Sequence, residues 1–240
     1  MEYKAIRIAF LVVALCLAGS AAEAATAKGQ VAKGATFEWT SPTKRIVLVQ
    51  PDVQLSALDA GGILEPRADW TQSAQGFIDK GIRDHFDKSG AEVVNADSPT
   101  ARDVQLAKLH GVVGQAILTH LYNTPLRLPN KGKALDWTLG PGTNEMREHY
   151  GADYALFVFV RDSYSTAARR AEQVVGVLAA AALGVGVIPQ GGVQIGFASL
   201  VDLRTGNIVW FNRLLNQSGD LRTDAPAKRT VDELIGGMPI

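Results

Sequence analysis

Cysteine is almost absent from this sequence of 240 residues. The one cysteine, Cys16, lies in an apolar run from Ile8 to Ala18, which follows a short charged segment and precedes the small residues Ala22-Glu23-Ala24. This order is typical of a secretory signal, so we predict a signal peptide over residues 1–24 and an exported mature chain. That chain would contain no cysteine, so its fold must depend on the hydrophobic core and not on disulfides.

A lipid anchor is not predicted from this cysteine. Cys16 follows Leu15 and lies inside the apolar run, whereas a lipoprotein carries a small residue directly before a modified cysteine that comes after the run. We therefore expect a periplasmic protein, with association with the outer membrane as the alternative.

Net charge is absent too. The chain has 24 Lys and Arg residues against 24 Asp and Glu residues. Because nucleic acids and anionic lipid surfaces attract proteins with an excess of basic residues, neither is a default partner.

The motifs of common catalytic and metal sites are missing as well. The four histidines are His85, His110, His120 and His149, no two of which are i and i+4 neighbours, and no H-E-x-x-H occurs. There is no G-x-S-x-G nucleophile elbow, and Gly132-Lys133 lacks the other residues of a phosphate loop. We expect structural histidines, no metal, no cofactor and no assigned catalytic residue.

Charge is locally absent from Gln173 to Val201, and within this stretch Val174–Ile188 forms an apolar run of 15 residues. A membrane span needs about 20 such residues. The alternatives are a helix buried under the sheet or against another subunit, an insertion that touches the membrane, and a true span. The residues predicted to make membrane or subunit contact are Val174, Val175, Val177, Leu178, Leu183, Val187 and Ile188.

The clearest structural signal is a pair of β-rich runs joined by a turn. Residues 193–203 alternate between apolar and small or polar side chains, Arg204-Thr205-Gly206-Asn207 supplies turn residues, and Ile208-Val209-Trp210-Phe211 follows. This pattern predicts a β-hairpin.

Around this hairpin we predict a single mixed α/β domain over residues 43–240: a three-layer-like sheet with a parallel βαβ start and a C-terminal antiparallel hairpin, flanked by helices. Residues 25–42 are expected to be a flexible lead-in, and the apolar insertion lies near 164–192. The expected strands lie near 46–50, 91–95, 153–161, 193–203 and 207–213, and the expected helices near 68–89 and 99–122, with shorter ones at 143–151 and 230–235.

One constellation remains as a candidate site. The connection from Asp52 to Arg67, expected to be a long loop, follows the first strand, and open α/β sheets bind ligands beyond the carboxyl ends of their strands. The candidate ligand-binding or partner-binding residues are Gly61, Gly62, Glu65, Arg67, Asp69 and Trp70. The alternative is structural, with Asp69 at the helix dipole, Glu65 and Arg67 as a solvated pair and Trp70 in the core.

Four stretches resemble a family of uncharacterised exported proteins of the Gram-negative envelope: KRIVLVQPDVQL, GGILEPRADWTQSA, YGADYALFVFVRDSYS and VDLRTGNIVWFN. The last is also similar to a hairpin motif of the curli secretion channel protein and of lipoproteins that activate penicillin-binding proteins. This resemblance implies a protein that assembles into oligomers or binds envelope partners and has no known active site. The chain departs from the often lipidated members of that group because it has no usable lipidation cysteine.

Together these observations predict a non-enzymatic periplasmic or outer-membrane-associated accessory protein. Its partners would be an envelope protein or further copies of the same chain, with membrane contact through residues 174–188 as an option. The alternative is an envelope hydrolase that uses the carboxylates of residues 61–70.

Overall fold

A long central strand, β6 (Tyr154–Ser165), organises the sheet. In the computed structural model, which describes residues 29–37, 45–88, 90–123, 126–182, 192–214 and 219–239, β6 pairs along one edge with the antiparallel strand β7 (Gln194–Asp202). Along its other edge two parallel strands follow one another: β2 (Arg45–Leu48) beside the first part of β6 and β3 (Asp52–Leu58) beside the second. The predicted signal peptide lies outside the described residues.

The remaining strands complete a mixed sheet of eight strands. Its order is β1-β8-β7-β6-β2-β5, and β4 pairs with the free edge of β3. The other strands are β1 (Gln30–Val31), β4 (Leu64–Pro66), β5 (Glu92–Asn95) and β8 (Ile208–Leu214). The strands β2, β3, β5 and β6 pair in parallel, whereas β7, β8, β1 and β4 join in antiparallel fashion, which confirms the predicted mixed α/β fold.

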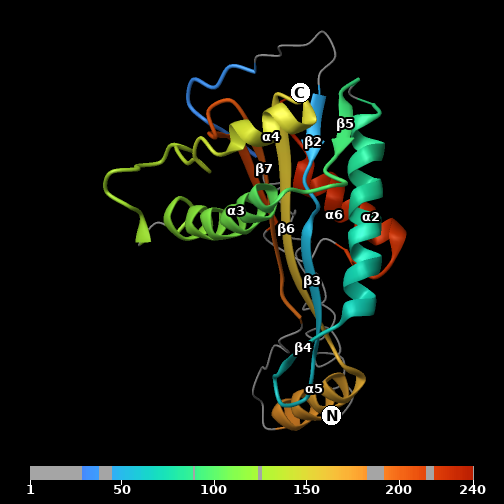
Figure 1. The fold of residues 1–240 in the computed structure, drawn as a ribbon. Coiled ribbons are helices and arrows are strands. Elements are labelled where there is room, and N and C mark those ends of the chain that lie inside the picture. The colour runs from blue at the N-terminus through green and yellow to red at the C-terminus, as the bar shows by residue number, and fades with distance from the viewer. Residues whose placement is uncertain are drawn as a thin grey trace, which may run out of the picture.

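Helices cover both faces of the sheet (Figure 1). The helices α2 (Ala68–Phe86) and α6 (Asp224–Ile235) pack on one face, and α3 (Ala101–His120) and α4 (Thr143–Tyr150) pack on the other. Alternate residues of β6 enter each layer, since Leu156 and Val158 contact the α2 side while Phe157 and Phe159 contact the α3 side. Burial on both faces explains why β6 reads as a continuous apolar run in the sequence.

The predicted hairpin is confirmed. Strands β7 and β8 pair antiparallel, and the turn between them is closed by hydrogen bonds from Gly206 N to Asp202 O (2.8 Å) and from Asp202 N to Asn207 O (3.0 Å). Gly206 has a φ of +76° and its Cα faces the Gly140 backbone so closely that a Cβ would overlap it. Glycine is therefore required here for both its backbone conformation and its lack of a side chain.

Two predicted boundaries were wrong. The connection from Asp52 to Arg67 is not a loop, because it contains β3, a turn and β4, with Val53, Leu55 and Ala57 buried at every second position. Helix α6 begins at Asp224, six residues before the start predicted at residue 230. In addition, part of the predicted lead-in belongs to the sheet, since Gln30 and Val31 pair with β8.

His110 lies in the core between α3 and the sheet. Its ring stacks on Phe157 at 5.0 Å and lies 5.3 Å from the Phe197 ring, and Nε2 is 2.9 Å from Ser199 Oγ. Burial lowers the pKa of His110 to about 3 from an ordinary value of 6.5. The histidine is therefore neutral in the folded protein and has a structural role, as its sequence context predicted.

Acid is expected to destabilise the protein through this residue. The unfolded chain takes up the proton first, so the stability contributed by neutral His110 is complete above pH 6.5 and is lost as the pH falls from 6.5 towards 3. Between pH 7 and pH 5 the free energy of unfolding should fall by about 2 kcal/mol from this group alone. Urea denaturation at both pH values measures it, and the variant His110→Leu with Ser199→Ala, which removes both polar partners, should lose this part of the pH dependence. An unchanged pH dependence in that variant would contradict the assignment.

Candidate functional site

The candidate segment Gly61–Trp70 lies at one end of the elongated sheet, where β3 turns into β4 and α2 begins (Figure 1). Gly62 N donates to Asp59 O (3.2 Å) and Ile63 N donates to Asp59 Oδ1 (2.7 Å), which closes a tight turn. Gly62 has a φ of +83°. Gly61 and Gly62 thus build the turn between two strands, and this accounts for their presence without a ligand.

Arg67 and Asp69 form a two-pronged ion pair at the start of α2. Arg67 Nε and Nη2 lie 3.1 and 2.9 Å from the two Asp69 oxygens. This hydrogen bonding to Arg67 lowers the pKa of Asp69. The side chains of Asp69 and Glu65 are both exposed. A hydrolase would need a carboxyl group with a raised pKa in a closed cleft. The structure gives Asp69 the opposite pKa shift, so we do not propose the hydrolase alternative.

Trp70 is half-buried and belongs to a stack of aromatic rings and guanidinium groups. Its ring meets that of Tyr164 edge-on at 5.9 Å, and the guanidinium carbons of Arg67 and Arg222 lie 4.4 and 4.9 Å from its centre. Arg222 also lies 4.0 Å from the centre of the Tyr164 ring. Cation–π contacts of this kind tie the start of α2 to β6 and to the segment before α6.

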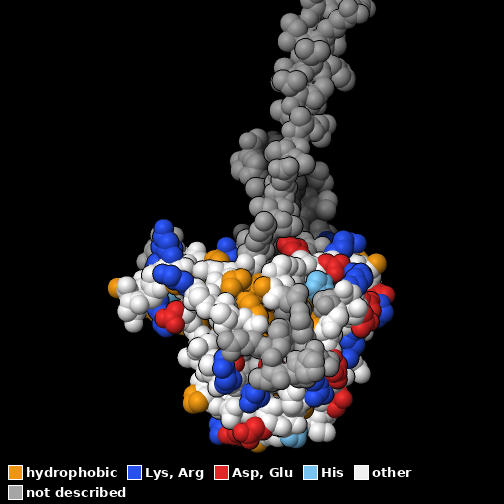
Figure 2. All heavy atoms as spheres, turned by 90° about the horizontal axis from the view of Figure 1, so that it is seen from above, with side chains coloured by type: hydrophobic (Ala, Val, Ile, Leu, Met, Phe, Trp, Pro, Cys, Tyr) orange, Lys and Arg blue, Asp and Glu red, His pale blue; other side chains and the backbone are white. Residues whose placement is uncertain are grey.

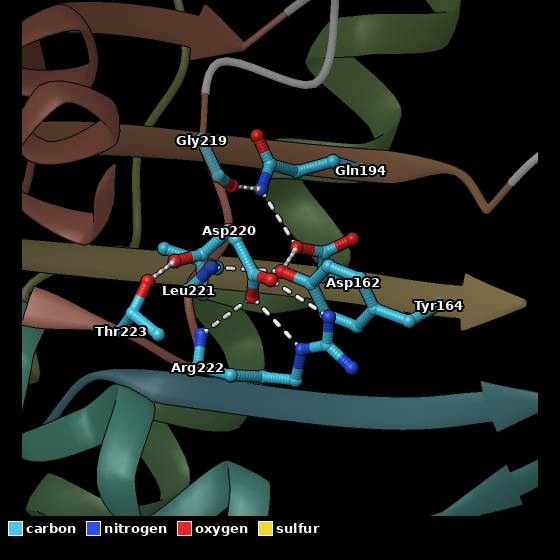
Figure 3. Close-up of polar contacts among 8 residues, drawn as sticks. All are labelled: Asp162, Tyr164, Gln194, Gly219, Asp220, Leu221, Arg222 and Thr223. Carbon is cyan, nitrogen blue, oxygen red and sulfur yellow. Dashed lines mark hydrogen bonds and ion pairs between the residues drawn. The ribbon is translucent and has the colours of Figure 1, made fainter.

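A buried polar network lies behind this stack (Figure 3). Asp162 Oδ2 accepts hydrogen bonds from Tyr164 Oη (2.5 Å) and Gln194 Nε2 (2.7 Å). Tyr164 Oη accepts from Leu221 N (2.8 Å), and Gln194 Nε2 also donates to Gly219 O (3.1 Å). The network therefore fastens the segment before α6 to β6 and β7.

The ionisable groups of this network have pKa values shifted in opposite directions. Burial raises the pKa of Asp162, whose side chain is 3% exposed and whose Oδ1 has no hydrogen-bond partner. Burial, with the hydrogen bond to Asp162, raises the pKa of Tyr164 as well. Asp220 forms a bidentate ion pair with Arg222 (2.7 and 2.9 Å), which lowers its pKa.

The sequence did not reveal this network. The strand predicted near 153–161 would leave Asp162 just past its end, in a turn. Strand β6 instead continues to Ser165, and this places Asp162 inside the sheet, where Leu55 and Gln194 are its neighbours on β3 and β7. Three consecutive polar residues, Arg161, Asp162 and Ser163, interrupt the apolar pattern before Tyr164, so the sequence carried no clear signal that the strand continues.

Large apolar side chains are exposed on several elements at this end of the sheet. Ile63, Leu64, Val193 and Ile195 are between 45% and 63% exposed, and Val175 on α5 (Ala167–Ala182) is 66% exposed. Helix α5 is attached there, because Thr166 N donates to Leu58 O (2.9 Å) and Arg169 Nη1 donates to Asp59 O (3.1 Å). We call the surface formed by Ile63, Leu64, Val175, Val193 and Ile195 the β4–α5 end.

The apolar run Val174–Ile188 is described in part. Its first portion forms helix α5, in which the side chains of Val174, Val177 and Leu178 are not described, and Leu183, Val187 and Ile188 lie outside the described residues. Within the described part of the chain, no helix is long and apolar enough to cross a bilayer.

A hollow of about 440 Å³ lies beyond the carboxyl ends of β2 and β5, beside Gln50, Gln75 and Asp97. Open α/β sheets bind ligands beyond the carboxyl ends of their strands, and this hollow is in that position. The candidate segment Gly61–Trp70 lies further from these strand ends, because β3 comes between β2 and the segment. Two polar wall residues of the hollow, Asp79 and Asn95, both bond to Arg83, with Asp79 at 2.9 Å. In the residues described, no three His, Cys, Asp or Glu side chains are placed to hold a metal ion.

No protein-family model and no curated protein sequence matches the chain. Among solved structures it is similar to the lipoprotein GNA1162 of Neisseria meningitidis (15% identity, 71% of this chain and 80% of that one, TM-score 0.31). It is also similar to the PelC dodecamer of Paraburkholderia phytofirmans (14% identity, 85% of this chain and 94% of that one, TM-score 0.36). A third similar structure is the C-terminal domain of LpoB of Salmonella enterica (13% identity, 73% of this chain and 84% of that one, TM-score 0.26). At these scores the likenesses support no argument about function, so the proposals below rest on the residues of this chain.

Proposed function

We propose that this protein is an exported, non-enzymatic accessory protein of the cell envelope that acts through protein contacts made by its β4–α5 end. The observation that carries the proposal is that Leu64, Val193 and Ile195 are exposed on one face at this end of the sheet, while Ile63 before β4 and Val175 on the attached helix α5 are exposed as well. Exposed large apolar side chains that share one face of a sheet are candidates for an interaction site.

Strand pairing supports a shared contact surface. Leu64 on β4 lies opposite Leu58 on β3, which lies opposite Ser165 on β6. Ile195 on β7 lies opposite Arg161 on β6. Arg161 and Ser165 are four residues apart on the same strand, so they point to the same face. These side chains therefore lie on one face of the sheet. Further along the strands, α3 covers this same face over Phe159 and Phe197. Each methylene of the exposed residues that a partner covers would contribute about 0.8 kcal/mol to binding before the costs of association.

The charge pattern favours a protein partner over a strongly charged partner such as a nucleic acid. Arg67 and Arg161 near the β4–α5 end are neutralised by Asp69 and Asp52, at 2.9 and 2.8 Å. Acidic and basic side chains are interspersed over the face seen from above in Figure 2, in keeping with the zero net charge of the chain. No field of one sign is therefore available on that face to attract a nucleic acid.

Leu64→Glu is expected to abolish the capture of the partner from an envelope extract by the tagged protein, with no change in melting temperature, because Leu64 is 55% exposed. Leu126→Glu, at a leucine of similar exposure (52%) away from the β4–α5 end, is the matched control and should retain capture. If Leu64→Glu captures the same proteins in the same amounts, this end is not the contact surface.

Membrane contact through residues 174–188 is the second form of this proposal, and the exposed Val175 on α5 favours it. It predicts that Val175→Glu moves the protein from the membrane fraction to the soluble fraction of the envelope. A protein-only contact predicts no change in fractionation and loss of the captured partner.

A further inference from the structure

Gly76 lies in the interior of α2, where a glycine weakens a helix. The other glycine of this helix, Gly81, has a packing reason, since an added Cβ would lie 3.2 Å from Val231. At Gly76 no other part of the chain lies within 4 Å of the place that a Cβ would take. Gly76 instead lines the hollow of about 440 Å³ beyond β2 and β5, so its missing side chain keeps this hollow open.

This hollow continues into a second one of about 340 Å³. The two share several wall residues and form one groove: Gln50, Pro51, Gln75, Ala96 and Pro99. Ala96 N donates to Leu48 O at the end of β2 (3.2 Å), and from there the chain crosses the sheet to α3 (Figure 1). We call the two hollows together the α2–α3 groove, because residues of α2 line its larger part and residues of α3 its smaller part.

Two exposed charges of the α2–α3 groove, Asp97 and Lys108, have no ion-pair partner among the described residues. Asp97 lines only the larger part of the groove and Lys108 only the smaller part. The other wall carboxylates have partners within the chain: Asp79 pairs with Arg83 (2.9 Å), Asp52 pairs with Arg161 (2.8 Å), and Asp103 accepts a hydrogen bond from Tyr150 Oη (3.1 Å). The groove therefore offers a carboxylate in one part and an ammonium group in the other.

Amide and apolar side chains lie between and beside these charges. Gln50 and Gln75 line both parts of the groove, and their amide groups have no hydrogen-bond partner among the described residues. A side-chain amide both donates and accepts, as a peptide group does. The smaller part also has an apolar wall that includes Val104 and Ala107. The groove can thus bind a ligand that combines peptide groups with an apolar side chain.

The same wall disfavours other common classes of small ligand. Among the described residues that line the groove none is aromatic, so a sugar ring, a base or a quaternary ammonium group has no ring to stack on. Lys108 is the only Lys or Arg side chain among them, whereas phosphate groups are typically held by Arg forks or clusters of charged donors.

We propose that the α2–α3 groove binds a short peptide with both termini free, its ammonium group at Asp97 and its carboxylate at Lys108. The amides of Gln50 and Gln75 bind its peptide group, and an apolar side chain near its C-terminus lies against Val104. The two parts of the groove, about 440 and 340 Å³, have the volume of small-ligand sites, which is about 300–1,000 Å³. This site is separate from the β4–α5 end and goes beyond the function proposed above.

The dipeptide alanyl-leucine is the probe, and its titration into the purified protein is followed by NMR spectroscopy of the backbone amides. Gly76→Leu fills the groove with a side chain and removes a glycine from a helix, so it should abolish the chemical-shift changes and leave the melting temperature equal or higher. Gln72→Leu is the matched control. It adds the same side chain one turn earlier on α2, at an exposed position that does not line the groove, and should bind the dipeptide as the parent protein does.

Modified dipeptides test the two charged contacts. Asp97→Asn should weaken the binding of alanyl-leucine about two- to fivefold, the range of an exposed ion pair, and should not further weaken that of its N-acetylated form. Lys108→Met should act in the same way on alanyl-leucine and should not further weaken the binding of its C-terminal amide.

Three results would overturn the proposal. They are the absence of alanyl-leucine binding to the parent protein, binding by Gly76→Leu as tight as that of the parent, and a charge variant that weakens the modified dipeptide as much as the free one. Binding of glycerol or maltose in place of the dipeptide would also overturn it, because a polyol has neither terminal charge. The β4–α5 end takes no part in these titrations, so their outcome is independent of whether that end binds an envelope partner.

Discussion

Replacing Phe197 by alanine is expected to lower the free energy of unfolding by about 4 kcal/mol. Phe197 is fully buried on β7, stacks on Phe159 at 4.7 Å and on Phe211 at 5.6 Å, and lies beneath α3. The substitution removes a ring that three aromatic neighbours contact and leaves a cavity that the rigid sheet cannot close. Urea denaturation at pH 7 measures the loss.

Gly114 provides the matched test of this packing. An added Cβ at Gly114 would overlap the Phe197 ring, so Gly114→Ala alone should destabilise the protein by about 1–3 kcal/mol. In the Phe197→Ala background the overlap is gone, and the higher helix propensity of alanine should make the same change neutral or stabilising by up to about 1 kcal/mol. Additive effects of the two substitutions would show that α3 does not rest on Phe197 as described.

Replacing Asp162 by alanine should cost about 3 kcal/mol, the second large effect. The carboxylate accepts from Tyr164 Oη and Gln194 Nε2 inside the sheet, and its removal takes an acceptor away from both of these buried donors. Gln194 Nε2 keeps the Gly219 carbonyl as its second acceptor, so the Tyr164 hydroxyl is the group left without its acceptor. The expected result is a lower denaturation midpoint and earlier proteolysis at the segment before α6, which Tyr164 Oη holds through Leu221 N. Limited proteolysis followed by mass spectrometry locates the cleavage.

Asp162→Asn separates the role of the acceptor from that of the charge. Its amide oxygen can take both hydrogen bonds, while its NH2 group occupies the place of Oδ1, which has no partner. Because burial raises the pKa of Asp162, ionising this carboxyl disfavours the folded state, and the penalty disappears as the pH falls below its folded pKa. Asp162→Asn should therefore match or exceed the stability of the parent protein at pH 7. A loss equal to that of Asp162→Ala would contradict this account of the network.

Local patterns were sufficient to predict most of the fold. The period of two in Val193–Asn212 predicted the hairpin, and the spacing of Ile78, Ile82 and Phe86 in α2 predicted the buried face of that helix. Most of β7 and β8 is buried on both faces, and Val193 and Ile195 are exposed. Strand β3 was missed because Pro51 and Asp52 suggested that the strand had ended. The chain in fact breaks only briefly there and resumes along the same edge of β6, a continuity that depends on β6 being long enough to pair with both segments.

The candidate site was harder to predict because its contacts are distant in sequence. The acid, base and aromatic residues of Glu65–Trp70 were recognisable, but the sequence could not show that Arg222 and Tyr164 stack on Trp70. The same holds for the exposure of Leu64 and Val193. Each belongs to an apolar pattern that usually indicates a core position, and only the placement of the strands shows that no described helix covers them.

The most direct test of the proposed function is photo-crosslinking in intact cells, with a benzoylphenylalanine residue at position 63 and, as the control, at position 126. We predict a discrete crosslinked species with another envelope protein from position 63, formed at native expression level, and none from position 126. The absence of any crosslinked protein from position 63 on irradiation, in cells where the protein is exported and folded, would contradict the claim that the β4–α5 end binds a partner.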